Sequence, residues 1–213
     1  MRYKQAFPNR MNTEWNKEKH PDWYKDIPKM RYLILGSYPP HPSKRDYPFY
    51  YPNRRNRFWR VLAALSGYHL TWKKGQAADL AVQERHAIME HLQVGVQNLG
   101  LEVERKGMSA LDTHIRITKF QDIVKILDSH PELEMILLPG FSAPDSTAKS
   151  FSRYISEQNL GTCHVEHIKA HHAFEVRYKD RVIKCVVLNS TSTASRIKYD
   201  ELLDQFKMYI RKI

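Results

Sequence analysis

The sequence contains few cysteines and no long hydrophobic run, and each shortage excludes a class of protein. Its two cysteines, Cys163 and Cys185, are too few for a four-thiolate zinc or iron–sulfur site. Both lie in apolar segments, so we expect free thiols in a reducing compartment, while their spacing leaves a disulfide open. No stretch is long enough to span a membrane, and the N-terminus has no apolar signal-peptide core. We therefore expect a cytoplasmic protein without a membrane partner.

Acidic residues are also scarce relative to basic ones. The chain has 23 Asp and Glu against 34 Lys and Arg, a formal net charge of +11. This excess is spread along the chain and attracts polyanions, of which nucleic acid is the first candidate. The alternative is a soluble protein that happens to be basic. With 213 residues, of which 42% are hydrophobic, the chain is long and apolar enough for one well-buried domain.

Short apolar runs alternate with amphipathic segments, as in α/β proteins. We expect strands at residues 32–35, 94–99, 135–138, 163–168, 174–178 and 182–188. We expect helices at residues 13–18, 56–66, 79–92, 119–129, 146–158 and 198–213, and a surface loop at residues 102–112. The sequence thus predicts an α/β fold in which a mainly parallel sheet of about four strands is covered by helices. A single domain would span residues 31–213, with residues 1–30 as an N-terminal arm packed on it.

A long loop joins the first predicted buried strand to the first amphipathic helix. It mixes aromatic and amide side chains with basic ones: Lys44, Arg45, Arg54, Arg55, Arg57 and Arg60. Basic charge beside aromatic rings suits a partner with phosphates and bases. The loop leaves its strand at the carboxyl end, where open α/β sheets bind ligands. Two further strand exits, at residues 138–141 and 188–192, would open on the same edge of the sheet, so we expect one shared crevice.

Four motifs occur in order from Tyr32 onward. They are LILGSYP at residues 33–39, YY followed by NRFWR at residues 50–60, RKGMSALD at residues 105–112 and LNSTSTA at residues 188–194. Together they resemble the motifs of the uracil-DNA glycosylase superfamily, and most closely its hypoxanthine-DNA glycosylase and mismatch-specific branches. The resemblance implies a three-layer α/β/α sandwich. It also implies a monomeric, monofunctional hydrolase without metal or cofactor, which flips a damaged base out of duplex or single-stranded DNA and cuts its N-glycosidic bond.

The resemblance also implies catalytic roles for two residues. Asn56 would hold the attacking water, because Tyr38 stands where the first motif usually has an asparagine. Asp112 would assist as a base or as an electrostatic partner. Each has an ordinary alternative: Asn56 as the N-cap of a helix, and Asp112 as a residue of a surface turn.

Base binding is implied for the second group of residues: Ser37, Tyr38, Tyr51, Gly140 and Phe141. Backbone amides at Ser37 and Tyr38 would contact the flipped base, and the Tyr51 ring would stack on it, unless it is only a core tyrosine. Pro139 stands where the family often has the asparagine that reads uracil, and proline offers no N–H donor. The accepted base is therefore left open between uracil and a purine such as hypoxanthine.

Phosphate contacts are implied for the third group: Arg54, Arg55, Arg57, Ser190, Thr191, Ser192 and Arg196. The hydroxyl run at residues 190–192 would bind backbone phosphates, or else simply cap the last helix. Two other functions compete weakly. Gly140-Phe141-Ser142 resembles an incomplete nucleophile elbow, and the histidines at residues 164–172 lack the carboxylate spacing of a metal site, so we expect no metal. The serious alternative is a nucleic-acid-binding module on the same fold that has lost catalysis.

Overall fold

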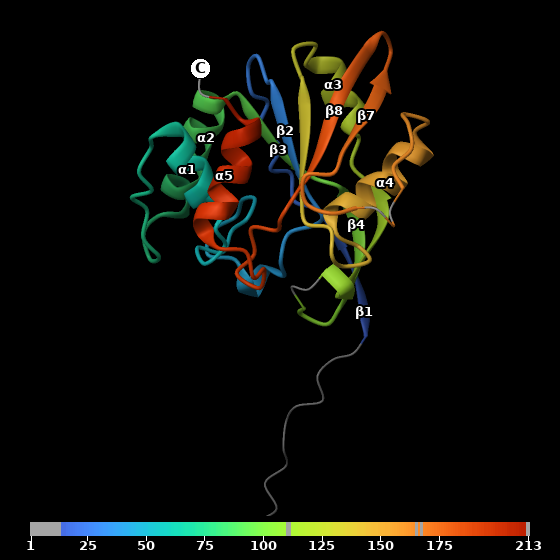
Figure 1. The fold of residues 1–213 in the computed structure, drawn as a ribbon. Coiled ribbons are helices and arrows are strands. Elements are labelled where there is room, and N and C mark those ends of the chain that lie inside the picture. The colour runs from blue at the N-terminus through green and yellow to red at the C-terminus, as the bar shows by residue number, and fades with distance from the viewer. Residues whose placement is uncertain (1–13, 110–111, 165, 167, 212–213) are drawn as a thin grey trace, which may run out of the picture.

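The computed structural model describes residues 14–109, 112–164, 166 and 168–211. Its larger sheet has the strand order β3-β2-β6-β8-β7 (Figure 1). The strands are β2 (Tyr32–Gly36), β3 (Val94–Asn98), β6 (Met135–Pro139), β7 (Ala173–Tyr178) and β8 (Arg181–Leu188). The first four in this order are parallel, and β7 pairs with β8 as an antiparallel edge strand. The prediction of a mainly parallel sheet is confirmed, and the hairpin adds a strand to the expected four.

A second, antiparallel sheet contradicts three of the predicted elements. It consists of β1 (Trp15–Lys19), β4 (Gly100–Lys106) and β5 (Ile115–Phe120), in the order β1-β4-β5. The expected helix at residues 13–18, the loop at residues 102–112 and the helix start at residue 119 are therefore wrong where they overlap these strands. Arg105 explains the misreading of β4. Its side chain is fully buried and forms an ion pair with Glu18 at 2.8 Å, so a charged stretch hides an inward-facing position.

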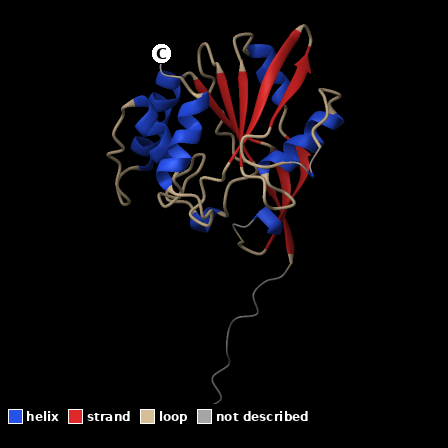
Figure 2. Cartoon of the chain, in the orientation of Figure 1, coloured by secondary structure: helices blue, strands red, loops and turns tan. Residues whose placement is uncertain are grey.

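The helices divide into two groups in Figure 2 as in Figure 1. In this view α1 (Phe58–Ser66), α2 (Ala78–Leu92) and α5 (Tyr199–Tyr209) stand together on the left of the sheet. On the other side, α4 (Thr147–Glu157) stands on the right, and α3 (Ile123–Ser129) overlaps the upper part of β8. Two single turns of 3-10 helix, η1 (Pro42–Lys44) and η2 (Asp112–His114), lie in loops. Gly67 ends α1 in the left-handed conformation, at φ 75°, directly after the predicted last residue of this helix.

Two predicted boundaries also need correction. No strand is found among the described residues of the segment 163–168. The edge of the sheet beside β8 is formed instead by β7, whose Arg177 N–H donates to Leu160 O at 2.9 Å. The last helix ends at Tyr209 and not at residue 213. The longest helix in the described ranges has 15 residues, and none there is both long and apolar enough to cross a bilayer.

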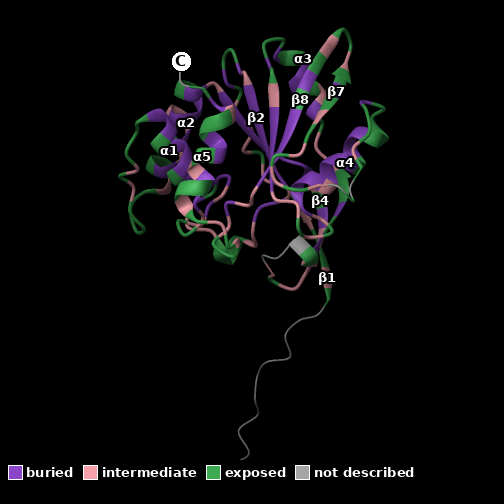
Figure 3. Ribbon diagram, viewed as in Figure 1, coloured by how far each residue is buried: buried purple, intermediate pink, exposed green. Residues whose placement is uncertain are grey.

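Strand β2 forms the centre of the core, as its burial in Figure 3 shows. Leu33, Ile34 and Leu35 are all fully buried, which is typical of a parallel strand covered on both faces. Each such side chain contributes about 1.5–3 kcal/mol of hydrophobic free energy. Ile27 and Met30, from the segment before β2, are equally buried, so residues 14–30 share this core.

Candidate functional site

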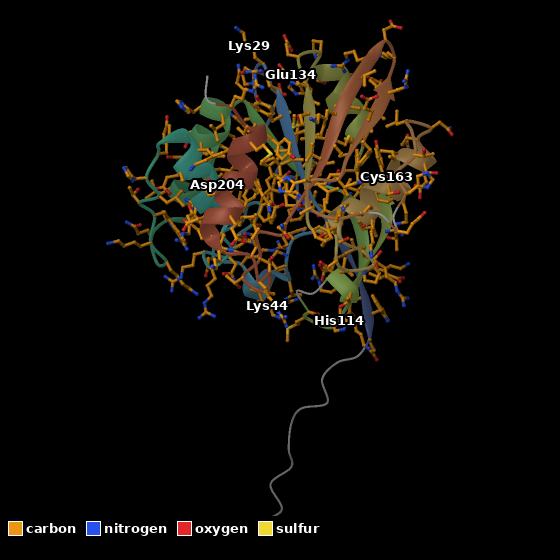
Figure 4. All side chains as sticks on the ribbon, viewed as in Figure 1. Lys29, Lys44, His114, Glu134, Cys163 and Asp204 are labelled. Atoms are coloured by element: carbon orange, nitrogen blue, oxygen red, sulfur yellow. The ribbon has the colours of Figure 1, made fainter. Side chains whose placement is uncertain are left out.

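A cavity of about 820 Å³ lies at the carboxyl ends of the parallel strands. Its wall is built by the segments that follow β2, β6 and β8, together with the loop around Tyr51 and the end of β3. Lys44, which lines the cavity, lies at the lower end of the molecule in Figure 4, whereas Lys29 and Glu134, beside the amino ends of β2 and β6, lie at the upper end. The three strand exits therefore meet in one crevice, as the sequence predicts.

Most residues of the predicted site line this cavity. The structure places there Ser37, Tyr38, Tyr51, Arg55, Asn56, Gly140, Phe141, Ser190, Thr191, Ser192 and Arg196. Arg54 instead lines a smaller adjoining groove of about 290 Å³. The side chain of Asp112 lies outside the part that the structure describes. These placements bring the predicted residues together and leave their chemical roles to be tested.

Arg57 departs from its predicted role as a phosphate ligand. Only 9% of the residue is exposed, and its guanidinium donates to backbone carbonyl oxygens of the segment after β8. Nη1 donates to Ile197 O at 2.6 Å, and Nη2 donates to Ser192 O at 2.8 Å. Its backbone N–H also donates to Thr191 O at 3.0 Å. Arg57 is thus committed to holding this segment against α1 and is not available to a phosphate.

Asn56 both lines the cavity and bonds to the first residue of α1. Its Oδ1 accepts a hydrogen bond from Phe58 N–H at 2.9 Å, one of the N–H groups that a helix start leaves without an intrahelical partner. The N-cap residue itself is Arg57, so the alternative holds only in that Asn56 satisfies the N–H of Phe58. This contact leaves hydrogen-bonding capacity on the Asn56 side chain, because an amide oxygen has a second lone pair and the amide nitrogen has two N–H donors. Asn56 can hold a water molecule while its position is fixed by the helix.

Tyr51 presents an aromatic wall. Its ring lies on Phe58 with 3.8 Å between centroids and 17° between planes. The residue has a φ of 45°, a conformation that non-glycine residues adopt at a cost of about 1 kcal/mol or more and that concentrates at functional sites. Tyr47 Oη donates to the Tyr51 carbonyl at 3.1 Å and helps to hold this turn.

Tyr38 is a packed residue, and its ring serves the core. It is 7% exposed, and the Arg105 guanidinium lies 5.5 Å from its ring centre. Burial raises the pKa of Tyr38 to about 12, so the phenol is neutral at physiological pH. A contact to a ligand from this position would come from the backbone, as the sequence predicts for Ser37 and Tyr38.

Asn98 is a cavity residue that the predicted site lacks. It ends β3, pairs in register with Gly36 and is 5% exposed. A Cβ added at Gly36 would lie 2.3 Å from Asn98 Oδ1 and 3.2 Å from Tyr51 Oη, so only glycine leaves room for this amide. The amide that reaches the wall thus comes from the end of β3, and not from Pro139 at the end of β6. The sequence predicts cavity residues at the carboxyl ends of three parallel strands. The same search at the end of the fourth parallel strand, β3, would have found Asn98.

The charge of the cavity is basic. Lys44, Arg55 and Arg196 line it, and no carboxylate occurs among the described lining residues. Within the described ranges, no group of three His, Cys, Asp or Glu is placed to hold a metal ion. Polar contacts to a ligand would therefore come from amides, hydroxyls, backbone N–H groups and basic side chains, a combination that suits an anionic ligand.

Comparison with known proteins supports the fold. No family model matches the chain, and no curated protein matches it in sequence. Among solved structures, it is similar to the solution NMR structure of a "putative Uracil DNA glycosylase" from Methanosarcina acetivorans, with a TM-score of 0.55 and 20% sequence identity. The match covers 86% of this chain and 90% of that one. At this identity the likeness shows a shared α/β fold over most of both chains.

Proposed function

We propose that this protein is a DNA glycosylase that hydrolyses the N-glycosidic bond of a deaminated base, uracil or hypoxanthine, flipped out of DNA. The observation that carries the proposal is the convergence of Tyr51, Asn56 and Asn98 on one cavity with a basic rim. The four ordered motifs and the fold of the archaeal neighbour support it, and the helices would complete a three-layer α/β/α sandwich around the sheet.

The cavity offers a deaminated base two complementary contacts. Tyr51 supplies a ring against which a base can stack, an interaction worth about 1–3 kcal/mol per base. Asn98 supplies an amide oxygen at the inner wall. Deamination converts a ring nitrogen lone pair into an N–H group, at N3 of uracil and N1 of hypoxanthine, so a hydrogen-bond acceptor favours the deaminated base over its parent. A cavity of 820 Å³ is within the range of small-molecule sites.

Hydrolysis needs a positioned water and a stabilised leaving base. Asn56 would hold the water against the anomeric carbon, and Asp112, three residues before β5, would assist as base or as a partner for the oxocarbenium-like sugar. Backbone N–H groups at Ser37 and Tyr38 would favour the departing base anion. The C–N bond breaks, the water oxygen bonds to C1′, and the base leaves with a proton.

The rim would hold the DNA backbone. Arg55 and Arg196 line the cavity, as do the hydroxyl residues 190–192. Phosphate contacts from these groups would fix the strand and help to balance the few kcal/mol that extrusion of a base costs. Arg54, in the adjoining groove with Lys74, would meet a flanking phosphate.

An oligonucleotide assay tests the proposal. Duplex and single-stranded oligonucleotides that carry uracil, hypoxanthine or xanthine are incubated with the protein and then treated with alkali. We expect strand breaks at one or more lesions, abolished in Asn56→Ala and retained in Asn16→Ala, an exposed asparagine of β1. Tight, salt-sensitive binding without breaks on any lesion would instead establish the binding module, which the lack of a carboxylate among the described lining residues favours.

A further inference from the structure

His20 lies behind the cavity wall, in a cage of aromatic rings. It follows β1 directly and is 6% exposed. Its ring centre lies 5.4 Å from that of Trp23, 5.6 Å from that of Tyr38 and 5.9 Å from that of Tyr50. The cage leaves the imidazole little room to rotate, so the two ring nitrogens meet fixed partners.

These partners determine which nitrogen carries the proton. Nδ1 lies 2.5 Å from the carbonyl oxygen of Pro21, and because a carbonyl only accepts, Nδ1 must be the N–H donor. Nε2 lies 2.9 Å from Asn98 Nδ2. In a neutral imidazole with Nδ1 protonated, Nε2 is an acceptor, so the hydrogen bond runs from Asn98 Nδ2–H to His20 Nε2.

The ring is neutral at physiological pH. Burial lowers the pKa of His20 to about 4, against an opposing contribution from the Pro21 carbonyl. Of the charged groups that face the ring, Arg45 lowers the pKa further and Asp22 raises it. The surrounding groups from other segments are the neutral rings of Tyr38 and Tyr50.

The hydrogen bond from Asn98 to His20 determines which atom of the Asn98 amide faces the cavity. With Nδ2 held by His20, the oxygen of the Asn98 amide must point the other way, beside Gly36 and the Tyr51 hydroxyl. We propose that His20 is a positioning residue that sets the orientation of the Asn98 amide and so makes the inner wall of the cavity a hydrogen-bond acceptor. Its effect on base choice rests on the proposed glycosylase function. A turned amide would present Nδ2–H instead and would match the ring lone pair of adenine or cytosine.

Two substitutions separate orientation from packing. His20→Gln keeps an acceptor oxygen that can face Asn98 Nδ2, whereas His20→Leu fills similar space and accepts nothing. His86→Leu is the control, because His86 is a half-buried histidine whose ring, like that of His20, packs against an aromatic residue, here Phe49.

The first measurement is independent of activity. Long-range ¹H–¹⁵N NMR spectra are expected to show His20 with Nδ1 protonated and Nε2 unprotonated from pH 8 to pH 5. The Asn98 side-chain amide resonances should shift in His20→Leu and stay near their wild-type positions in His20→Gln and His86→Leu. A His20 protonated at Nε2, or Asn98 resonances that do not respond to His20→Leu, would overturn the proposal.

The second measurement compares substrates. Single-turnover excision rates are measured with excess enzyme for hypoxanthine against adenine and for uracil against cytosine. We expect the lesion-to-parent ratio to fall about tenfold or more in His20→Leu, to recover in His20→Gln and to be unchanged by His20→Leu when Asn98 is already alanine. An unchanged ratio in folded His20→Leu would contradict the proposed effect on base choice. If the wild type excises no base, the proposed function fails, and the NMR measurement alone decides whether His20 orients Asn98.

Discussion

The ring of Tyr51 lies flat on the ring of Phe58, the first residue of α1, with 3.8 Å between their centres. This pairing attaches the loop between β2 and α1 to a buried helix, because Phe58 itself is fully buried. Phe58 also donates its N–H to Asn56 Oδ1, so the same residue of α1 holds both Tyr51 and Asn56 at the cavity wall.

Replacement of Tyr51 should separate stacking from the hydroxyl. Tyr51→Ala is expected to lower kcat/KM for the lesion by about tenfold to a hundredfold, since one base–aromatic stack is worth about 1–3 kcal/mol. Tyr51→Phe should avoid most of that loss, because the ring remains on Phe58. Steady-state kinetics on a lesion oligonucleotide provide the measurement, and equal losses in both variants would mean that the hydroxyl and not the ring face matters.

A methyl group at Gly36 should displace Asn98. The Cβ of Gly36→Ala would lie 2.3 Å from Asn98 Oδ1, so the amide must move out of its place. We expect loss of lesion excision together with about 1–3 kcal/mol of unfolding free energy, the usual range for overpacking. Urea unfolding and the alkali-cleavage assay measure the two effects, and a fully active Gly36→Ala enzyme would show that Asn98 is not needed.

Removal of the Arg57 guanidinium should destabilise the segment after β8, because this group donates hydrogen bonds to its backbone carbonyls. Arg57→Met leaves several buried carbonyls without their donor, so we expect a loss of about 2–4 kcal/mol of unfolding free energy. Arg60→Met, at an exposed arginine over the Tyr199 ring, should cost about 1 kcal/mol or less. Urea denaturation of both variants distinguishes a structural arginine from a surface one, and equal losses would contradict the buried role.

The rim arginines should determine the salt dependence of DNA binding. If Arg55 and Arg196 each contact one phosphate, each alanine variant should reduce the slope of log K against log salt concentration by about 0.9. Arg177→Ala, at an exposed position on β7, is the control and should leave the slope unchanged. Fluorescence anisotropy between 50 and 200 mM salt measures the slopes, at concentrations in the range where such effects are large. If all three variants keep the wild-type slope, the phosphates do not contact Arg55 or Arg196.

The buried His20 should make folding sensitive to acid. Its folded-state pKa of about 4 lies below the ordinary value of 6.5, so below pH 6.5 the unfolded chain takes up a proton that the folded protein refuses. The stabilisation is complete above pH 6.5 and is lost as the pH falls toward 4, in total by about 3 kcal/mol. Urea unfolding between pH 7.5 and pH 4.5 should show a smaller loss in His20→Gln. A slope that this substitution leaves unchanged would assign the acid sensitivity to other groups.

The central sheet could be predicted because its strands carry their own signal. Leu33, Ile34 and Leu35 form a short apolar run, and such a run is explained most simply by burial on both faces. The small sheet could not be predicted, since its strand β4 buries a charged residue, Arg105, whose partner Glu18 is 87 positions away in the sequence. A pattern read locally cannot supply such a partner.

The site, like the fold, could be predicted only in part. Strand exits that share one edge brought Ser37, Gly140 and Ser190 to a common cavity, because parallel pairing guarantees it. The orientation of the Asn98 amide depends on His20, and the structural role of Arg57 depends on carbonyls of a distant segment. Neither leaves a periodic trace in the sequence.

Strand β8 enters the sheet between β6 and β7, and the segment that follows it closes the cavity. Another part of the cavity wall, Asn98, is held by His20, near the other end of the described chain. During synthesis on the ribosome, therefore, the pocket cannot form completely until about residue 197 has emerged. A shorter nascent chain already contains Tyr51 but lacks the segment after β8 that completes the cavity wall. Long-range closure of this kind slows folding, and it also keeps the incomplete chain from acting as the finished protein would.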